Sequence, residues 1–262
     1  MTKLIINADD FGYSKGVNYG IAEAHLTGAV TSATMMANMP GLSHALKLRK
    51  ELPNLGVGVH LSLTLGKPVS PHVELLTDEK GVFKARAHYE THKAEPNQLY
   101  EEWKAQVTKL LHLGVPLTHI DSHHHMHTVD GHKEVAERLS EKFELPLRTY
   151  PGARRPEQEK YYPAEVYWNI FHAPLMKDMS RPYSEIKDEV LAVLEKGAGK
   201  HAAYELVEAG CHPGYVDTIL YFQSSFHLPR MREVEILTSP EFLSMLSVYG
   251  YELCHYGDWG GL

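Results

Sequence analysis

The sequence is poor in the features that disulfide-stabilised and membrane proteins need. Its 262 residues include only two cysteines, Cys211 and Cys254, which form no C-x-x-C pair. Two isolated cysteines are typical of a reduced, cytoplasmic protein. No run of about 18 or more apolar residues occurs, so we expect no membrane-spanning helix. The apolar run at the N-terminus is too short for a signal peptide.

Positive charge is also scarce. The formal net charge is −7 and the basic residues form no run, which argues against nucleic acid or an anionic membrane as a partner. The apolar fraction of 43% and the charged fraction of 23% are those of an ordinary globular protein. The length suits one large domain over residues 1–262. The composition and the negative net charge fit a small, near-neutral or polar substrate. They leave the oligomeric state open, with a homodimer as one option.

Common catalytic signatures are absent from the sequence as well. It has no G-x-S-x-G motif, which would indicate a serine hydrolase. No G-x-G-x-x-G motif follows the first predicted strand, which weakens a dinucleotide-binding interpretation. The segment GVGVHLSLTLG (56–66) lacks the Gly-Lys-Ser/Thr end of a phosphate-binding loop. The composition instead draws attention to the 18 histidines.

The sequence does contain a regular alternation of β-rich and amphipathic runs. Strands are predicted over residues 4–9, 31–39, 55–63, 117–123, 145–150, 203–212 and 251–258. Helices are predicted over residues 16–28, 41–52, 96–113, 131–143, 184–196 and 239–249. This pattern indicates an α/β fold with a mainly parallel sheet of about seven strands, either open or closed into a (β/α) barrel. The connections 66–95 and 151–183 are expected to shape a substrate cleft.

Unusual polar residues occur where the predicted strands end. The carboxyl ends of parallel strands meet at one edge of a barrel or open sheet, and active sites form at that edge in both folds. We therefore expect these side chains to gather in a single site. They are Asp9, Asp10, His60, Asp121, His123, Arg148, His212, His255 and Asp258.

The adjacent pair Asp9 and Asp10 follows the first strand. Two neighbouring carboxylates are costly to bury unless a cation accompanies them. Because neighbours on a strand point in different directions, one carboxylate could bind a metal while the other stays free as a base. The alternative is structural, with Asp10 or Ser14 capping the helix predicted near residue 16.

The segment HIDSHHHMH (119–127) is the densest group of potential metal ligands. If residues 117–123 form a strand, His119, Asp121 and His123 share one face. His123 and His127 are four residues apart and could bind one metal together on a helical turn. Alternatively, only one of them binds, and Asp121 orients a ligand histidine through its free N–H. A solvated polar loop is the structural alternative.

An aspartate with two histidines would form an open donor set. Such a set leaves coordination positions for water and substrate, as catalytic sites do. It accepts one divalent ion, with Mg²⁺ or Zn²⁺ expected and Mn²⁺ or Co²⁺ as alternatives.

The segment EAGCHPGYVD (208–217) places His212 at a strand end before a Pro-Gly turn. A histidine can give a proton to a leaving group near neutral pH, and Asp217 could pair with it or with substrate. A structural turn histidine is the alternative. A Cys211–His212 nucleophile pair is less favoured, because neighbours on a strand point to opposite sides.

Together these motifs resemble the YdjC-like carbohydrate deacetylase family, whose members include chitooligosaccharide deacetylases. The similar segments run through nearly the whole chain, and they are INADDFG (6–12), GVHLSLTLGKP (58–68), HIDSHHHMH (119–127), LPLR (145–148), CHPGY (211–215) and PRMREVEILTSPE (229–241). The resemblance implies a distorted (β/α) barrel related to the polysaccharide deacetylases.

The resemblance also implies roles for individual residues. It implies metal ligands at Asp10, His60 and His123, a catalytic base at Asp9 and, as a suggestion, the acid at His212. The remaining candidates are expected to bind substrate or to support the ligands, and they are Asp121, His127, Arg148 and Asp217.

The function expected from these features is hydrolysis of the N-acetyl group of an acetylated amino sugar or chitooligosaccharide to acetate and a free amine. Aromatic residues of the second long connection would stack on sugar rings or belong to the core, and they are Tyr161, Tyr162, Tyr167 and Trp168. The alternative is a metal-dependent sugar isomerase or sugar-phosphate phosphatase, with Arg148, Arg154 and Arg155 as candidates for a phosphate clamp. A module that only binds metal or sugar is disfavoured, because binding needs no spare carboxylate.

Overall fold

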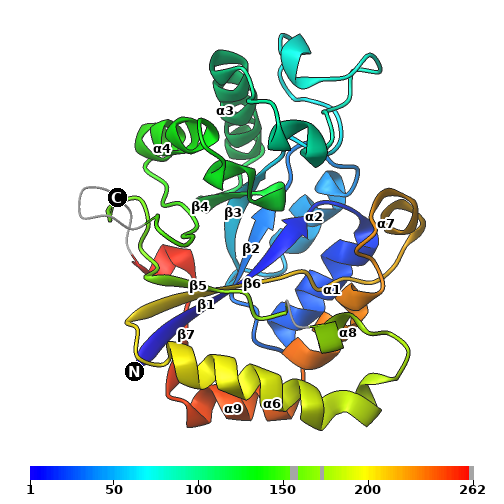
Figure 1. The fold of residues 1–262 in the computed structure, drawn as a ribbon, viewed down its shortest axis with the longest axis vertical. Coiled ribbons are helices and arrows are strands. Elements are labelled where there is room, and N and C mark those ends of the chain that lie inside the picture. Colours follow the sequence, from blue (N-terminus) through cyan, green and yellow to red (C-terminus); the bar gives the residue numbers. More distant parts are fainter. Residues whose placement is uncertain (154–158, 172–173, 260–262) are drawn as a thin grey trace.

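The sheet in the computed structural model is curled and parallel throughout, and it carries helices around its outside (Figure 1). The model describes residues 1–153, 159–171 and 174–259, so Arg154 and Arg155 lie outside the described residues. The strand order is β4-β3-β2-β1-β6-β5, with β7 beside the first part of β1. The strands are β1 (Thr2–Phe11), β2 (Ser32–Met35), β3 (Gly56–Leu61), β4 (Leu117–Ser122), β5 (Val166–Trp168), β6 (Leu206–Cys211) and β7 (Tyr251–Leu253).

Most of the helices follow the predicted amphipathic runs. They are α1 (Lys15–Leu26), α2 (Leu42–Arg49), α3 (Pro96–His112), α4 (His132–Phe143), α5 (Pro174–Lys177), α6 (Tyr183–His201), α7 (Thr218–Gln223), α8 (Pro229–Leu237) and α9 (Pro240–Val248). Of these, α5, α7 and α8 were not predicted. In α8, buried charged residues mask the amphipathic pattern. In the described part of the chain, no helix is both long and apolar enough to cross a membrane.

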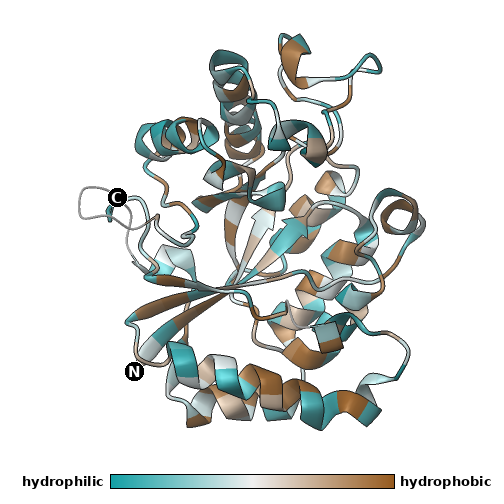
Figure 2. Ribbon diagram, viewed as in Figure 1, coloured by the Kyte–Doolittle hydropathy of each residue, from teal (hydrophilic) through white to brown (hydrophobic). Residues whose placement is uncertain are grey.

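The two faces of the sheet differ in polarity. In β1, Leu4, Ile6 and Ala8 belong to the main hydrophobic core, whereas Asn7 and Asp9 are buried polar residues. Alternation along a strand sends these two sets to opposite faces. On the polar face, Asn7 Oδ1 lies 3.0 Å from Nε2 of His119 in β4, a strand that is not a neighbour of β1. The carboxyl end of β1 is therefore hydrophilic although the strand is buried (Figure 2).

The fifth predicted strand differs from the structure. Residues 145–150 form no strand and contribute only one parallel bridge, between Leu147 and Ile120 of β4. Pro146 and Pro151 lack the N–H groups that a longer ladder would need. The fifth strand lies instead at residues 166–168, inside a segment predicted as a connection.

The last strand ends at Leu253, five residues before its predicted end at Asp258. The Asp258 carboxylate accepts the backbone N–H of His255 at 2.9 Å, which turns the chain into a 3₁₀ turn, Tyr256–Trp259. Contrary to the strand-end argument, neither His255 nor Asp258 is among the described residues around the main cavity.

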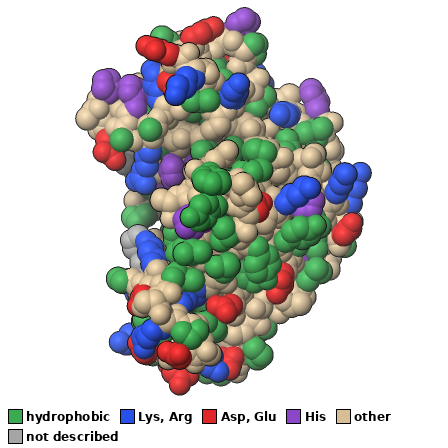
Figure 3. All heavy atoms as spheres, turned by 90° about the vertical axis from the view of Figure 1, so that its right-hand side faces the viewer, with side chains coloured by type: hydrophobic (Ala, Val, Ile, Leu, Met, Phe, Trp, Pro, Cys, Tyr) green, Lys and Arg blue, Asp and Glu red, His purple; other side chains and the backbone are tan. Residues whose placement is uncertain are grey.

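Hydrophobic side chains gather on the face of the molecule seen in Figure 3, at the right of Figure 1, where α1 and α7 lie. Exposed aromatic residues of these helices are Tyr19, Tyr221 and Phe222. The chain leaving α7 continues to the wall of the cavity, where Ser224 and Phe226 are exposed to its interior.

Candidate active site

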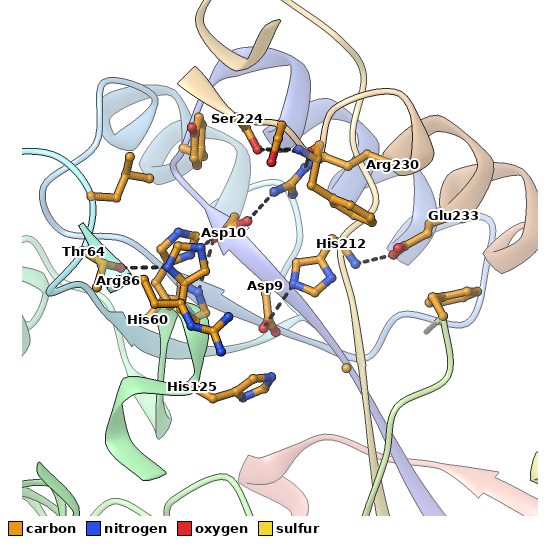
Figure 4. Close-up of a pocket in the computed structure, with 18 of the residues that line it drawn as sticks. Asp9, Asp10, His60, Thr64, Arg86, His125, His212, Ser224, Arg230 and Glu233 are labelled. Atoms are coloured by element: carbon orange, nitrogen blue, oxygen red, sulfur yellow. Dashed lines mark hydrogen bonds and ion pairs between the residues drawn. The ribbon is translucent and has the colours of Figure 1, made fainter. Parts of the chain in front are cut away.

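A cavity of about 610 Å³ opens at the carboxyl edge of the sheet. All five residues that were expected to act in catalysis or to bind a metal line it, and they are Asp9, Asp10, His60, His123 and His212. Figure 4 labels Asp9, Asp10, His60 and His212 around this cavity. The structure thus brings together residues from β1, β3, the segment after β4 and the segment after β6. This gathering is the one expected for the ends of parallel strands.

A backbone irregularity lets both aspartates of β1 reach the cavity. Asp10 has φ of 70°, and the register with β2 shifts between Ala8 and Phe11. Left-handed backbone is strained for a residue with a side chain. It rotates Asp10 toward the same cavity as Asp9, whereas neighbours on a regular strand diverge. The cap of α1 is Ser14, whose hydroxyl accepts from the N–H of Val17, so the Asp10 carboxylate has no capping role there.

Asp10, His60 and His123 present three donor atoms to one point. Asp10 Oδ1 lies 2.9 Å from His123 Nδ1 and 3.3 Å from His60 Nε2. All three donors lie within 4.8 Å of one another. Donors about 2.1 Å from a shared tetrahedral ion lie about 3 to 3.5 Å apart. The geometry and the chemistry of this set therefore fit a divalent cation.

Asp121 contacts one of these three residues. Its Oδ1 lies 2.6 Å from His60 Nδ1, and its Oδ2 accepts from the hydroxyl of Thr34 at 3.0 Å. A carboxylate at Nδ1 fixes the proton there and leaves Nε2 facing Asp10, as the sequence analysis expects of Asp121. Although burial lowers the pKa of His60, Asp121 and Asp10 raise it to about 10. The two carboxylates thus favour positive charge between them, which a cation would also provide.

Asp9 lies outside this set of three donors, and its carboxylate is paired with an arginine. Arg148 donates to both its oxygens, from Nη1 to Oδ2 at 2.7 Å and from Nη2 to Oδ1 at 2.6 Å. Asn7 donates to Oδ1 at 3.0 Å. Burial alone would raise the pKa of Asp9, but Arg148 holds it well below its usual range. The sequence could not show that a strand-end arginine would turn toward this carboxylate.

Arg148 itself is fully buried beneath the cavity. Besides Asp9, it contacts Asp121 Oδ2 at 2.8 Å and Glu208 Oε1 at 2.7 Å. Its guanidinium is occupied by three carboxylates, so it supports the site from behind. The predicted roles of Arg148 in direct substrate binding or as a phosphate clamp do not fit this position.

The polar network continues to the far end of the barrel. Tyr256 donates from its hydroxyl to Glu208 Oε2 at 2.5 Å, and its ring stacks on His119 at 3.9 Å between centroids. His119 Nε2 lies 3.0 Å from Asn7 Oδ1. Glu208 was missed, although a single glutamate in the apolar run LVEAGC (206–211) is a signal that could have identified it.

His212 occupies the opposite wall from the histidine ligands (Figure 4). Its Nε2 lies 3.7 Å from Asp9 Oδ2, and its ring packs edge-on against Phe226. The side chain is 36% exposed, and its accessible part faces the cavity deep inside the protein. Burial there lowers the pKa of His212 to about 4, against the opposing effect of Asp9. His212 is therefore neutral at neutral pH before substrate binds.

His127 does not join His123 in the set of candidate donors. Residues 123–128 form a 3₁₀ segment in which His124 and His125 have left-handed backbone, with φ of 58° and 54°. This kink breaks the helical turn on which joint binding depends and directs His127 into the core. There its Nδ1 lies 2.6 Å from the hydroxyl of Ser122.

Asp217 also has a different place from the predicted one. Its carboxylate accepts from the N–H of Leu220 at 2.9 Å and from the N–H of Gly16 at 2.8 Å. It therefore caps α7 and anchors the first turn of α1. Asp217 is not among the described residues that line the cavity, and its carboxylate makes no pair with His212.

Several residues of the cavity were not singled out by their sequence. Arg230 and Glu233 come from α8, and Arg86 and Lys177 come from the two long connections. Among the aromatic candidates, Tyr167 lines the cavity, whereas Tyr162 and Trp168 belong to the buried core. A β-carbon at Gly210 would meet the Tyr167 hydroxyl at 1.9 Å, so this glycine provides the space that Tyr167 occupies.

Comparison with known proteins gives consistent matches over the whole chain. A model of the family described as YdjC-like protein matches residues 3–248. A carbohydrate deacetylase from Brevibacillus brevis is 38% identical over 262 residues, covering 98% of this chain and 100% of that protein. A carbohydrate deacetylase from Geobacillus stearothermophilus is 38% identical over 255 residues, covering 97% and 96%.

Solved structures agree with the predicted fold class. A crystal structure from Enterococcus faecalis V583 has a TM-score of 0.83 and 37% identity, covering 99% of both chains. A CE4 esterase from Streptococcus mutans has a TM-score of 0.56 and 10% identity, covering 97% of this chain and 85% of that one. The second likeness is one of fold, and it confirms the prediction of a distorted barrel of the polysaccharide-deacetylase type.

Proposed function

The chain belongs to the YdjC-like family, and we propose that it is a metal-dependent carbohydrate deacetylase, which hydrolyses the N-acetyl group of an acetylated amino sugar to acetate and a free amine. The observation that carries this proposal is the juxtaposition of two sets of groups in one cavity. Three side chains with a cation-binding geometry face the pair of Asp9 and His212, which can move a proton. The relatives named carbohydrate deacetylases support the same reaction class.

Asp10, His60 and His123 would hold the cation. A divalent ion bound by them would act as a Lewis acid toward the acetamide carbonyl and would lower the pKa of a neighbouring water. Two imidazole nitrogens and one carboxylate oxygen suit Zn²⁺, Mn²⁺ or Co²⁺, and Mg²⁺ would use the same aspartate with more water.

Asp9 and His212 would carry the proton transfer. Asp9 takes a proton from the attacking water at Oδ2, the oxygen that lies 3.7 Å from His212 Nε2. His212, neutral before the reaction, receives this proton and delivers it to the amine nitrogen as the C–N bond breaks. One proton thus leaves the water and one reaches the amine, so the charge of the site is restored after each turnover. Arg148 keeps the Asp9 carboxylate fixed during this sequence.

The size of the cavity is consistent with a sugar substrate. Its volume of about 610 Å³ lies within the range of roughly 300 to 1,000 Å³ that small-molecule pockets have. Tyr167 and Phe226 line the walls with partly exposed rings and provide flat faces on which a sugar ring can stack. Diacetylchitobiose is therefore the substrate we propose to test first.

The test is acetate release by protein that has been treated with chelator and then supplied with Zn²⁺, Mn²⁺, Co²⁺ or Mg²⁺. Diacetylchitobiose and single N-acetylated sugars serve as substrates, and chitobiose without acetyl groups controls for background acetate. We expect release that depends on the added metal and leaves one free amine for each acetate. Absence of metal-dependent release from the whole panel would refute the proposed function.

A further inference from the structure

Helix α8 buries three charged side chains of the segment PRMREVEIL (229–237) beside the cavity. Arg230, Arg232 and Glu233 are each exposed by no more than 2%. Burying a charge is unfavourable unless it is paired or hydrogen-bonded. Their partners therefore show what this helix does.

Arg230 holds the aspartate of the predicted metal site. Its Nη2 donates to Asp10 Oδ2 at 2.6 Å, and its Nε donates to the carbonyl of Phe226 at 2.8 Å. The other oxygen of Asp10, Oδ1, is the one that faces His60 and His123. Arg230 thus occupies one carboxylate oxygen and leaves the other for the cation. This bond also fixes a side chain whose own backbone is strained.

Glu233 holds the histidine on the opposite wall. It accepts the backbone N–H of His212, at the point where the chain leaves β6 and turns at Pro213. This contact sets the direction of the turn and hence the place of the His212 ring, between Phe226 and Asp9. Burial raises the pKa of Glu233 to about 8, but a neutral carboxyl group accepts this N–H as well.

Residues three apart on a helix lie on the same face, so Arg230 and Glu233 approach the cavity side by side (Figure 4). We propose that α8 is a positioning element of the active site, in which Arg230 restricts Asp10 to one-oxygen ligation and Glu233 sets the place of His212. This inference rests on the proposed function and assigns positioning roles to two cavity residues, which act through Asp10 and His212.

The test for Arg230 is R230Q in chelator-treated protein loaded with Co²⁺. Without its Arg230 partner, Asp10 can offer both oxygens to the ion, and Co²⁺ absorbs more weakly as its coordination number rises. We expect a weaker visible spectrum than in wild type and a kcat lower by about 10- to 100-fold. A spectrum and kcat equal to those of wild type would overturn the role of Arg230.

R232Q is the matched control on the same helix. Arg232 is equally buried, but it donates to the carbonyls of Leu175, Asp178 and Arg181 and not to Asp10. It should lower the melting temperature without changing the Co²⁺ spectrum. If R230Q does not fold, R230K replaces it, because lysine keeps the buried charge. R230K should shift the Co²⁺ spectrum in the same direction as expected for R230Q, but by less. An R230K spectrum equal to that of wild type would overturn the role of Arg230.

The test for Glu233 compares E233L with E233Q. Leucine removes the acceptor for the His212 N–H, and we expect kcat to fall by about 10- to 100-fold while the Co²⁺ spectrum stays that of wild type. Glutamine keeps an oxygen in the same place and should retain most of the activity. Equal loss in both variants, or no loss in E233L, would overturn the role of Glu233.

Failure of this inference can be told apart from failure of the proposed function. Wild-type protein that binds no Co²⁺ and releases no acetate would refute the metal-dependent reaction and this inference with it. Wild-type protein that does both, together with unaltered R230Q and E233L, would overturn the inference alone.

Discussion

Replacement of Arg148 by methionine is the perturbation for which the structure gives the clearest expectation. The guanidinium is fully buried and bonds three carboxylates, those of Asp9, Asp121 and Glu208. Methionine keeps an unbranched apolar stem but has no charge and no donors, so R148M leaves these carboxylates facing one another. Removing one partner of a buried ion pair costs about 3 to 5 kcal/mol.

This loss should be visible in thermal unfolding. For a chain of this size, 1 kcal/mol corresponds to about 2 to 4 °C in melting temperature, so we expect R148M to melt roughly 6 to 20 °C below wild type at pH 7. Both proteins are measured with chelator present, so that bound metal does not contribute. R181M is the control, because the pair of Arg181 with Glu189 is half-exposed and should contribute less than about 1 kcal/mol.

The pH dependence of this difference has a definite sign. Burial alone would raise the pKa values of Asp9 and Asp121, but Arg148 lowers both below their usual range. Such pairing stabilises the fold above the unfolded-state pKa of about 3.9, and the stabilisation is lost as the pH falls through the folded-state pKa. In R148M the unpaired carboxylates are protonated earlier as the pH falls, which relieves their repulsion.

The difference in melting temperature should therefore be largest near pH 7 and should shrink as the pH falls toward about 4 and below. A difference of less than about 1 kcal/mol at pH 7 would refute the reasoning, because it would mean that the three carboxylates do not depend on Arg148. A difference that widens on acidification would refute it as well.

Three further predictions concern the site directly. Asp9→Asn should leave Co²⁺ binding intact and lower kcat by about 10²- to 10⁴-fold, because an amide cannot take the proton of the attacking water; acetate release near the wild-type rate would contradict this. His123→Ala removes a donor and should weaken Co²⁺ binding in calorimetry, whereas His112→Ala, on the exposed face of α3, should not. Gly210→Ala should reduce turnover by displacing Tyr167, and adding Tyr167→Phe to this variant should recover part of the loss. Wild-type turnover in Gly210→Ala alone would show that the position of Tyr167 is unimportant.

The sequence was sufficient to predict which strand-end residues gather around the cavity. Asp10, His60 and His212 follow or end buried runs, and the carboxyl ends of parallel strands lie at one edge whatever the loops do. The prediction that these residues meet therefore depends only on strand order and direction. For the same reason, Asp121 could be expected to face a ligand histidine from the neighbouring strand.

Tertiary pairing was beyond reach of the sequence patterns. No periodicity shows that Arg148 turns inward to Asp9, or that Asp217 caps α7 instead of meeting His212. The misplaced fifth strand has a similar cause, because residues 145–150 and 166–168 are both short and apolar, and only the contact with β6 selects the second. The sequence left open whether His127 joins His123, because the motif does not show that two of its histidines have left-handed backbone.

The buried charges explain why this site and the stability of the barrel are linked. Asp10 can face the cavity only through a strained bulge, and the bond from Arg230 holds its carboxylate in this position. Asp9 can remain charged inside the barrel only beside Arg148, whose charge in turn requires Glu208 and the hydroxyl of Tyr256 below it. Replacement of Tyr256, which does not line the cavity, should therefore affect Asp9 through the charges of Glu208 and Arg148. The polar interior of this barrel is the support on which the carboxylates of the site depend, so replacing one member of it by an apolar residue, as in R148M, should weaken the fold as well as the site.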